Sequence, residues 1–574
     1  MRRLSLFASI LLSLTSVACG DDDGPADAGP GIDAAMEDGG DPHMGLRLPR
    51  CEDTDPAPEA PLPHVASTLV STLVPSVSRA GEAGPHNPAS ERGETLYREL
   101  GYHLVEVGPG QPHTKRTDLG ADTSATDARR SLAWFAHLSD FQLVDDESPT
   151  RLAQIDNPVL PGGLRAQEAY LPRAVSAMSR TFARIERDER PYDFGIVTGD
   201  CADSAQQNEI QWVIDLMNGA PALHTDSGDD DDPVPGPDND PKDPFDPVAF
   251  PAPWLFVPGN HDVEVVGITV PSDQLRERAL GTQAPSGTRD YTRWYATVSR
   301  GPIPADPARA IVDRDQIVEM LRASSATGPE GPPGHGFPAT GEVDTSLGAN
   351  YAYDAIPGLL RILSLDTSDL TGGSIGMVLR ETVDGWLIPE LDRAVADGVL
   401  VILASHHSTT SIDRQRGEVG SDEPNALSPE EIEQLVAARS EVIAWLVGHS
   451  HDNRIRAIPG PDAARPGYWE IMTSAIADYP SQARALEIVD NGDGTLSIFA
   501  TVIDYDTDDC FERRFRALTQ MEWVSRWVDD VSRAPEDNNV ELVRAVPASA
   551  AAAVAARSAT APARLESLTT LAGI

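Results

Sequence analysis

Basic residues are scarce in this chain. Its 574 residues include 45 lysines and arginines against 90 aspartates and glutamates, which gives a formal net charge of −45. A surface of that sign repels a phosphate backbone, so the composition argues against nucleic acid as a partner. It does not exclude a small phosphorylated substrate, and we expect a soluble exterior that attracts cations.

The apolar run at the N-terminus, Leu4–Leu14, is too short for a comfortable membrane span. It follows Arg2-Arg3 and precedes Ser16-Val17-Ala18, which is the three-part form of a secretory signal. Cys19 resembles the lipid-attachment cysteine of bacterial lipoproteins, although Ser-Val-Ala could equally serve an ordinary signal peptidase. We therefore expect residues 1–19 to be a signal peptide of the lipoprotein type. The mature chain would be exported and anchored in the bacterial cell envelope through Cys19.

Cysteine is nearly absent, with four residues in the whole chain. Export permits disulfides among those that remain after Cys19. Cys201 directly follows Asp200 at a predicted strand end, which favours a buried thiol. Cys51 and Cys510 are then left as the plausible pair.

Nucleotide-binding motifs are missing as well. The chain contains no Gly-x-Gly-x-x-Gly and no P-loop pattern. We therefore expect no residues that bind a nucleotide cofactor.

Composition also divides the chain into segments. Residues 20–63 are dominated by Asp, Gly, Pro and Ala and cannot bury enough apolar surface to fold, so they predict a disordered acidic linker. Residues 64–125 form an N-terminal extension without evident chemistry. An α/β domain is predicted at 126–505, followed by a C-terminal helical extension at 506–574.

Apolar runs that alternate with amphipathic stretches predict a layered α/β core. Helices are expected at 169–187, with Arg180, Arg184 and Arg187 on the solvent face, at 209–217, 431–438 and 523–531, and in the Ala-rich stretch 545–556. Strands are expected at 132–138, 192–198, 254–257, 351–353, 361–365, 399–404, 442–447 and 495–502.

Two irregular segments interrupt this pattern. The first, 224–253, contains Asp229-Asp230-Asp231-Asp232, but its spacing does not match an EF-hand loop, so we expect a solvated surface loop. The second, 326–349, is rich in Gly and Pro. Substrate specificity is expected to lie in such loops.

Five of the predicted strands are each followed by a polar cluster, at the position where α/β sheets place their sites. One such cluster builds an ordinary turn, but five of the same type argue for a shared site. The clusters are Asp140 with Gln142, Asp200 with Asp203, Asn260-His261-Asp262, Ser405-His406-His407 and Gly448-His449-Ser450-His451.

Carboxylate oxygen, amide oxygen and neutral imidazole together suit divalent or trivalent first-row ions. The donors are numerous enough for two ions, and one shared carboxylate would hold them about 3.5–4 Å apart. We therefore expect two metal ions drawn from Mn, Fe and Zn.

This ordered set resembles the calcineurin-like metallophosphoesterases, whose pattern is Asp-x-His, Gly-Asp-x-x-Asp, Gly-Asn-His-Asp/Glu, a lone His, and Gly-His-x-His. The match covers roughly residues 130–455 and is most specific at Gly259-Asn260-His261-Asp262 and Gly448-His449-Ser450-His451. The resemblance implies an exported bacterial member with a four-layer α/β sandwich, in which two packed mixed sheets are flanked by helices. It also implies hydrolysis of a phosphate mono- or diester by a metal-bridging hydroxide.

The resemblance also implies individual roles. His261 would act as the acid or the phosphate-stabilising group, with Asp203 orienting its ring. One metal would be held by Asp140, Asp200 and His451, and the other by Asp200, Asn260, His406 and His449, with Asp200 bridging.

Gln142 departs from the family, which usually has histidine at this position. An amide oxygen is a weaker ligand, so the first metal would be bound loosely, be an oxygen-preferring ion, or be absent. Asp145 or Asp146 could substitute as a ligand, but a solvated loop is the favoured role for both. The departure keeps open a degenerate metal-binding surface protein without turnover. A hydrolase of a sulfate ester or acyl phosphate is a further alternative.

Other histidines leave alternatives. His407 could replace His406 as the ligand, although His406 is favoured because it comes more directly off the strand. His137 lies within a strand, where a hydrogen-bonded core residue is favoured. His335 belongs either to a substrate loop or to a structural turn. The sequence does not indicate an oligomeric state.

Overall fold

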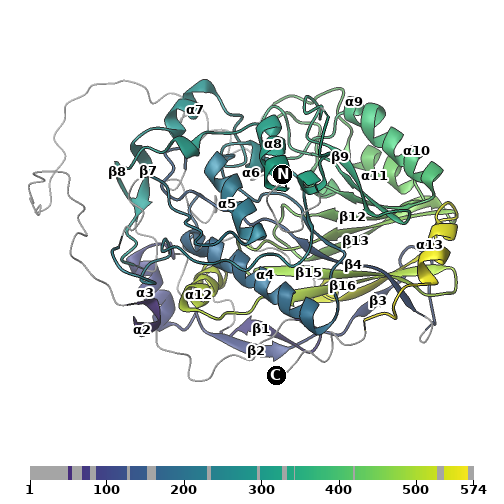
Figure 1. Cartoon of the computed structure of the whole chain (residues 1–574), viewed down its shortest axis with the longest axis horizontal. Helices are drawn as coiled ribbons and strands as arrows, with labels where there is room; N and C mark the ends of the chain where they lie inside the picture. Colours follow the sequence, from purple (N-terminus) through teal and green to yellow (C-terminus); the bar gives the residue numbers. More distant parts are fainter. Residues whose placement is uncertain are drawn as a thin grey trace, which may run out of the picture.

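The computed structural model of the chain is drawn in Figure 1. It describes residues 50–54, 67–77, 86–125, 129–151, 163–228, 234–293, 298–325, 333–341, 343–417, 420–525 and 535–565. The predicted signal peptide, most of the predicted linker and Asp229 to Asp232 lie outside these residues. Within the described part of the chain, no helix is both long enough and apolar enough to cross a membrane.

One mixed sheet contains seven strands. β4, β5 and β6 are parallel, whereas β15, β16 and β17 each run antiparallel to the preceding neighbour. β3 and β17 come from the predicted extensions 64–125 and 506–574, so both stretches contribute strands to this sheet. In spatial order the strands are β3 (Thr114–Arg116), β17 (Val540–Ala545), β16 (Thr495–Asp504), β15 (Gln482–Asp490), β4 (Arg130–Leu138), β5 (Phe194–Val197) and β6 (Trp254–Phe256).

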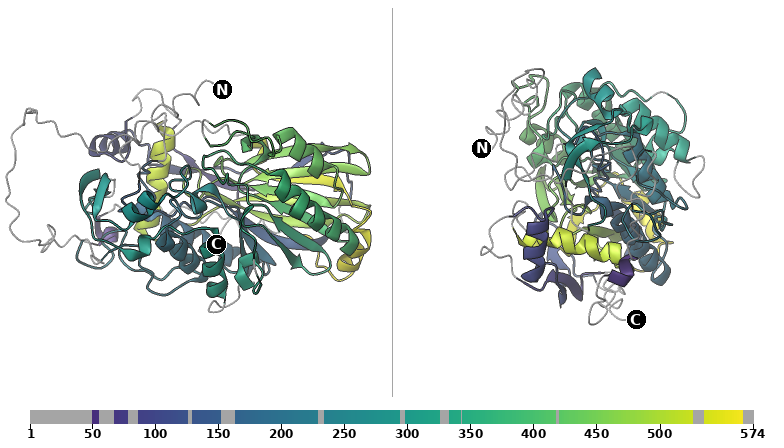
Figure 2. Two further views of the ribbon diagram at one scale, coloured as in Figure 1. Left: turned by 90° about the horizontal axis from the view of Figure 1, so that it is seen from above. Right: turned by 90° about the vertical axis from the view of Figure 1, so that its left-hand side faces the viewer.

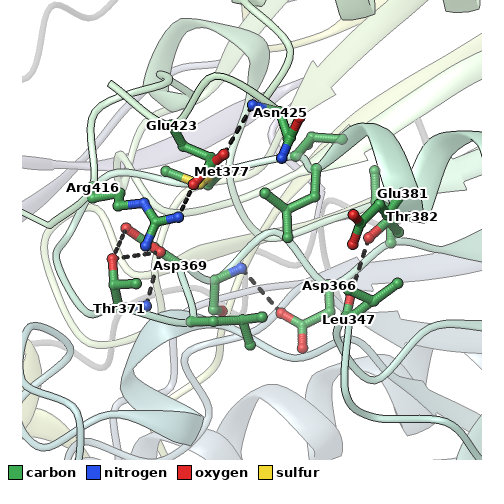
Figure 3. Close-up of a pocket in the computed structure, with 15 residues that line it drawn as sticks. Leu347, Asp366, Asp369, Thr371, Met377, Glu381, Thr382, Arg416, Glu423 and Asn425 are labelled. Atoms are coloured by element: carbon green, nitrogen blue, oxygen red, sulfur yellow. Dashed lines mark hydrogen bonds and ion pairs between the residues drawn. The ribbon is translucent and has the colours of Figure 1, made fainter. Parts of the chain in front are cut away.

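The second mixed sheet contains six strands. Its four central strands, β14, β12, β11 and β10, are parallel, and the two edge strands are antiparallel to their neighbours. The loops that follow β10 enclose a cavity of about 300 Å³, shown in Figure 3. In spatial order the strands are β13 (Arg454–Asp462), β14 (Arg465–Met472), β12 (Val442–Val447), β11 (Leu400–Ala404), β10 (Leu360–Ser364) and β9 (Tyr351–Ile356).

Both sheets contribute side chains to one buried hydrophobic cluster, which includes Phe135 and Leu255 from the first sheet and Ile402 and Leu446 from the second. α4 (Leu171–Asp188), α5 (Gln207–Asn218) and α12 (Cys510–Val524) share another cluster with the seven-stranded sheet. α10 (Ile388–Asp397) and α11 (Pro429–Ala437) share a third cluster with the six-stranded sheet, and Figure 2 shows them alongside it. The chain therefore has an α/β fold with two mixed sheets and helices.

Shorter elements complete the described chain. They are α2 (Cys51–Thr54), β1 (Ser71–Pro75), α3 (Glu91–Glu99), β2 (Val105–Pro109), α6 (Asn260–Val263), α7 (Asp273–Ala279), β7 (Gln283–Arg289), β8 (Val298–Pro302), α8 (Arg314–Ser325), α9 (Arg380–Thr382) and α13 (Ala551–Ser558).

A disulfide joins Cys51 in α2 to Cys510 at the start of α12, with 6.1 Å between the Cα atoms. The two helices lie together in Figure 2. This is the pair that remained after Cys201 was assigned to the core, and Cys201 is indeed a buried free thiol. Burial raises the pKa of the Cys201 thiol well above its ordinary value, which suits a structural rather than a nucleophilic role.

Each strand predicted from an apolar run overlaps a strand of the structure, but β13, β14, β15 and β17 were missed. β14 contains Pro466 and Gly467, and β15 carries Arg484 and Glu487, so none of these segments is a plain apolar run. In the Ala-rich stretch, β17 ends at Ala545 and α13 begins at Ala551. The predicted helix 523–531 coincides with the end of α12, and residues 526–531 lie outside the described part.

Two expectations about solvent exposure were wrong. Arg180 of α4 pairs with Glu512 at 2.7 Å and Arg184 pairs with Asp506, so this face of the helix is covered by the segment leading into α12. The insertion 224–253 is not a solvated loop where it is described, because Lys242 is only 3% exposed and pairs with Asp146 at 2.7 Å. Charge-rich composition does not distinguish solvated charges from buried ion pairs.

Candidate metal centre

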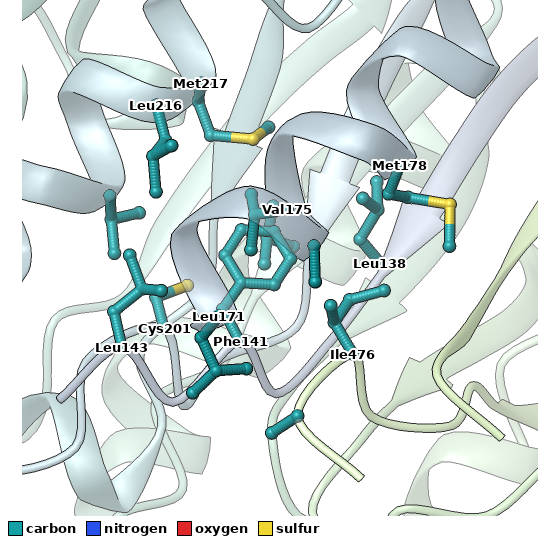
Figure 4. Close-up of a cluster of buried hydrophobic side chains, with 14 of the residues drawn as sticks. Leu138, Phe141, Leu143, Leu171, Val175, Met178, Cys201, Leu216, Met217 and Ile476 are labelled. Atoms are coloured by element: carbon teal, nitrogen blue, oxygen red, sulfur yellow. The ribbon is translucent and has the colours of Figure 1, made fainter. Parts of the chain in front are cut away.

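The polar clusters follow the C-terminal ends of parallel strands in both sheets. Apolar side chains next to them anchor the loops. Phe141, between Asp140 and Gln142, and Cys201, next to Asp200, point into the hydrophobic cluster under α4 and α5 (Figure 4). The local sequence thus holds each loop in the core by one residue and leaves its polar neighbours to form the site.

Strained backbone is concentrated at these loops. Left-handed φ angles occur at Asp140 (54°), Gln142 (46°), Asp200 (52°), His449 (72°) and His451 (54°), none of which is glycine. Such a conformation costs roughly 1–3 kcal/mol per residue and clusters at functional sites, where the surrounding structure imposes it. The strain therefore marks this part of the chain independently of the motif.

Asp200 lies at the centre of the cluster and is 1% exposed. Its Oδ1 accepts the backbone N–H of His261 at 2.9 Å, and its Oδ2 lies 2.9 Å from Nε2 of His406. Gly199 is required beside it, because a Cβ there would lie 2.8 Å from Nδ1 of His406. The carboxylate of Asp262 accepts the N–H of Cys201 and of Gly259, at 2.9 and 2.8 Å, and so ties the Asp200 loop to the Asn260 loop.

Two amide side chains present oxygen atoms that have no donor. Asn260 donates through Nδ2 to the carbonyl of Gly267 at 2.8 Å, which fixes the amide and leaves Oδ1 for the site. Asn260 Oδ1 and Gln142 Oε1 are both buried and have no hydrogen-bond partner among the described residues. Buried polar atoms are nearly always satisfied, so two orphan oxygens in one cluster indicate a missing partner that accepts lone pairs.

Histidines complete the cluster from the six-stranded sheet. His406 donates through Nδ1 to the carbonyl of Thr198 at 2.7 Å, so its Nε2 faces the site. That Nε2 lies 3.9 Å from Oδ1 of Asp140 and 3.2 Å from Nδ1 of His449. Nε2 of His451 lies 3.2 Å from the same oxygen of Asp140. Asp140, Asp200, His406, His449 and His451 are therefore brought together, as the sequence predicted.

The pKa values in this cluster reflect opposed buried charges. Burial disfavours the carboxylate of Asp200, but the charges of His406 and His261 outweigh burial and hold its pKa well below the usual range. Burial likewise disfavours protonated His406, yet Asp200 and Asp140 raise its pKa to about 9. Burial and the charge of His406 lower the pKa of His449 to about 3. Neutral His449 thus keeps a nitrogen lone pair available as a ligand.

Two groups within the cluster could hold a metal ion, and their ligand atoms lie within 4.8 Å of one another. The first is Asp140, Asp200 and His406, and the second is His406, His407 and His449. His407, the alternative ligand, is therefore close to the site, but its Nδ1 is 2.9 Å from the hydroxyl of Thr367. The donor set of carboxylate, amide oxygen and imidazole fits one or more first-row ions.

His261 lies beside the cluster, 18% exposed at its side chain. Its Nδ1 is 2.8 Å from the backbone carbonyl of Asp203 and 3.5 Å from the Asp203 carboxylate. The main chain of Asp203 therefore contacts the ring more closely than the carboxylate expected to orient it. Burial lowers the pKa of His261, but Asp200 and Asp203 together raise it to about 9.

Asp478 and Arg165 belong to the site and were missed. Oδ2 of Asp478 lies 2.6 Å from Nδ1 of His451, so it orients that ring, and Nε of Arg165 lies 3.0 Å from Oδ1 of Asp478. Nη1 of Arg165 also lies 3.9 Å from the carboxylate of Asp203. Asp478 follows β14, the strand that lacks a plain apolar run, so the only signal was a carboxylate after an unrecognised strand.

Asp145 and Asp146 are not in a solvated loop, so that expectation was wrong. They are 1% and 0% exposed. Asp145 accepts from Nε of Arg309 and Nδ2 of Asn208 at 2.9 and 2.7 Å, whereas Asp146 pairs with Lys242 and Arg289 at 2.7 and 2.9 Å. These partners occupy both carboxylates, which explains why neither substitutes for histidine at Gln142.

The remaining histidines are structural. His137 is fully buried, with its ring nitrogens 2.9 and 2.7 Å from the hydroxyls of Thr198 and Thr473, as expected of a core histidine. His335 stacks on Trp254 with 3.7 Å between ring centroids and lies 2.7 Å from the hydroxyl of Ser324. His335 therefore belongs to a structural turn, one of the two roles considered for it.

Comparison with protein-family models and with curated proteins finds no match. Among solved structures, the chain is similar to a dimetal phosphatase from Danio rerio, with 11% sequence identity and a TM-score of 0.33. The similarity covers 66% of this chain and 100% of that one.

Proposed function

We propose that this protein is a metal-dependent phosphoesterase that hydrolyses a phosphate mono- or diester. The observation that carries the proposal is the convergence of carboxylates, imidazoles and two orphan amide oxygens around Asp200. A site of this composition has little use for its unsatisfied oxygens unless a cation binds there. The arrangement of two sheets around a shared core, with helices on their outer sides, supports the four-layer sandwich that we propose for the fold.

Two ions would be held by this chain's own donors, from Mn, Fe or Zn. When bound, they would polarise the phosphoryl group and activate a water molecule at neutral pH. Binding would release the protons that now lie between the imidazoles and carboxylates, because metal ligands must be deprotonated. We assign Asp140, Gln142, Asp200 and His451 to the first ion and Asp200, Asn260, His406 and His449 to the second.

The residues around the ions would complete the chemistry. His261 is oriented through Nδ1 by Asp203, which leaves Nε2 to donate a proton to a phosphoryl or leaving oxygen. A Cβ at Gly267 would lie 2.4 Å from that Nε2, so glycine leaves room for the ring. Asp478, supported by Arg165, would fix the ring of His451 as a ligand.

The test is hydrolysis of p-nitrophenyl phosphate and bis(p-nitrophenyl) phosphate by protein stripped with a chelator and reloaded with Mn²⁺, Fe²⁺ or Zn²⁺. We expect turnover only after reloading, and its loss in Asn260→Ala, because that change removes an orphan ligand oxygen. Asn218→Ala is the matched control, since Asn218 lies at the end of α5 and bonds only to Trp254 among the printed side-chain contacts of the described chain.

A chain that binds two ions but hydrolyses neither ester would contradict the enzyme. That result would favour a metal-binding surface protein, the second candidate, for which Gln142 in place of histidine is the specific observation. Absence of bound metal would refute both candidates.

Gln142→His should strengthen metal binding at the first site. Imidazole is a better ligand than a neutral amide for these ions, so we expect the dissociation constant for Zn²⁺ to fall by about tenfold, the scale on which metal-site substitutions act. Competition with a chromophoric chelator measures the change without relying on turnover. Unchanged or weaker binding would show that residue 142 does not face the ion.

Export is also proposed, with Cys19 as a lipid anchor and a small phosphorylated substrate as the partner. The disulfide between Cys51 and Cys510 supports an oxidising compartment.

A further inference from the structure

The cavity of about 300 Å³ lies next to the candidate metal centre, at the C-terminal end of β10 (Figure 3). β10 pairs in parallel with β11, with Ser364 opposite Ala404, and His406 follows shortly after Ala404. Neighbouring strands are about 4.8 Å apart, so the cavity begins one strand away from a proposed ligand.

The cavity and the metal centre share a wall. Asp366 and Ser368 line the cavity, and the hydroxyl of Thr367 between them lies 2.9 Å from Nδ1 of His407. Farther along the same loop, Gly373 donates to Oε2 of Glu264 at 3.1 Å, in the segment that follows α6. A substrate bound at the metals would therefore have this loop beside it.

The lining of the cavity is apolar at one side. Leu365, Met377 and Val378 contribute buried side chains, each at most 7% exposed, and Leu347 and Leu379 also line it. This volume and lining suit a small alkyl group.

The opposite side carries excess negative charge. The cavity is lined by Asp366, Asp369, Glu381 and Glu423 but by one cation, Arg416. Arg416 pairs with Glu423, and Arg314 pairs with Asp366 at 2.8 Å. Among the described residues, no ion pair involves Asp369 or Glu381, so two carboxylates remain to attract a cation.

Ser368 provides a separate indication of a ligand. It is 6% exposed and lines the cavity, and its Oγ has no hydrogen-bond partner among the described residues. A buried hydroxyl without a partner is uncommon and suits a polar ligand atom.

We propose that this cavity binds the amino-alcohol portion of a phosphodiester substrate, with the alkylammonium group against Asp369 and Glu381 and its methyl groups on Leu365 and Met377. The proposal rests on the proposed phosphoesterase function and specifies its substrate class. An anionic group would be repelled here, both by this lining and by the chain's net charge of −45.

The test uses three p-nitrophenyl phosphodiesters with the same leaving group, whose second alcohol is choline, its neutral isostere 3,3-dimethylbutan-1-ol, or methanol. We expect kcat/KM for the choline ester to exceed that for the isostere by about fivefold, as one uncompensated charge near a protein surface allows. Glu381→Gln should remove most of this preference, because it removes a charge but keeps the shape. Glu430→Gln, an exposed carboxylate on α11, is the matched control and should leave the preference unchanged.

Met377→Trp should fill the cavity. It should lower kcat/KM for the choline and dimethylbutyl esters by about tenfold, the scale of steric discrimination in an apolar pocket, and leave the methyl ester within about twofold. Hydrolysis of all three esters without these differences would overturn the subsite but not the phosphoesterase.

Titration with choline chloride, followed by calorimetry, separates the two proposals if no ester is hydrolysed. Saturable binding that is lost in Met377→Trp would support the cavity as an amino-alcohol site while the proposed activity fails. No binding at millimolar choline, in a protein that also shows no ester preference, would overturn the subsite.

Discussion

Asp200→Ala is expected to remove both metal ions and to lower kcat/KM for p-nitrophenyl phosphate by at least about 10³-fold, equivalent to about 4 kcal/mol of transition-state stabilisation. Both carboxylate oxygens of Asp200 face the cluster, and its Oδ2 lies 2.9 Å from His406. In the proposed assignment this is the one residue shared by the two ions. Elemental analysis should show metal content falling from about two ions per chain to less than one.

Asp200→Asn is the companion variant, because it keeps the volume and a hydrogen-bond acceptor while removing the charge. It should lose metal in the same way, which separates ligand loss from misfolding. Asp215→Ala on α5 serves as the control, since Asp215 bonds to Gln211 on the same helix. Full metal content in both Asp200 variants would refute the bridging assignment.

Lys242→Met is expected to lower the free energy of unfolding by about 3 kcal/mol, as breaking a buried ion pair leaves a charge without compensation. Lys242 is 3% exposed, and its Nζ lies 2.7 Å from Asp146 and 3.5 Å from Asp226. Burial opposes the charge of Asp146, but Lys242 and Arg289 hold its pKa at about 2, so the carboxylate remains ionised. Urea unfolding monitored by circular dichroism measures the loss.

Lys115→Met provides the matched control, because Lys115 pairs with Asp122 at 2.5 Å where both side chains are exposed. We expect little change there, since solvent screens exposed pairs. The double variant Lys242→Met with Asp146→Asn should recover part of the lost stability by removing the stranded charge. Equal effects of the two lysine substitutions would contradict the buried network.

The strand ends could be predicted because their signal is local. An apolar run followed at once by Asp140 or Asp200 needs only the neighbouring residues to be recognised, and Phe141 anchors the loop in the core. The same reasoning failed for Asp478, because β14 carries Pro466 and Gly467 and did not look like a strand. It also failed for Asp145 and Asp146, because an aspartate that binds a distant arginine or lysine looks in sequence like one in water.

The cavity beside the metal centre could not be predicted. Its lining comes from separate loops, one after β10 and another around Arg416 and Glu423, and neither has a motif. The segment 326–349, expected to carry specificity, contributes only Leu347 to it. Loop segments acquire a shared surface only when the strands that support them are already packed.

Residue order alone established which donors this chain possesses and that each follows a strand, because chain chemistry and periodicity are local properties. It could not establish which donors meet. His449 and Asp140 are 309 positions apart, yet the N–H of His449 lies 3.1 Å from the carboxylate of Asp140. That proximity depends on two sheets sharing one hydrophobic core, so distances between side chains and the satisfaction of buried charges emerge only when the whole chain is folded.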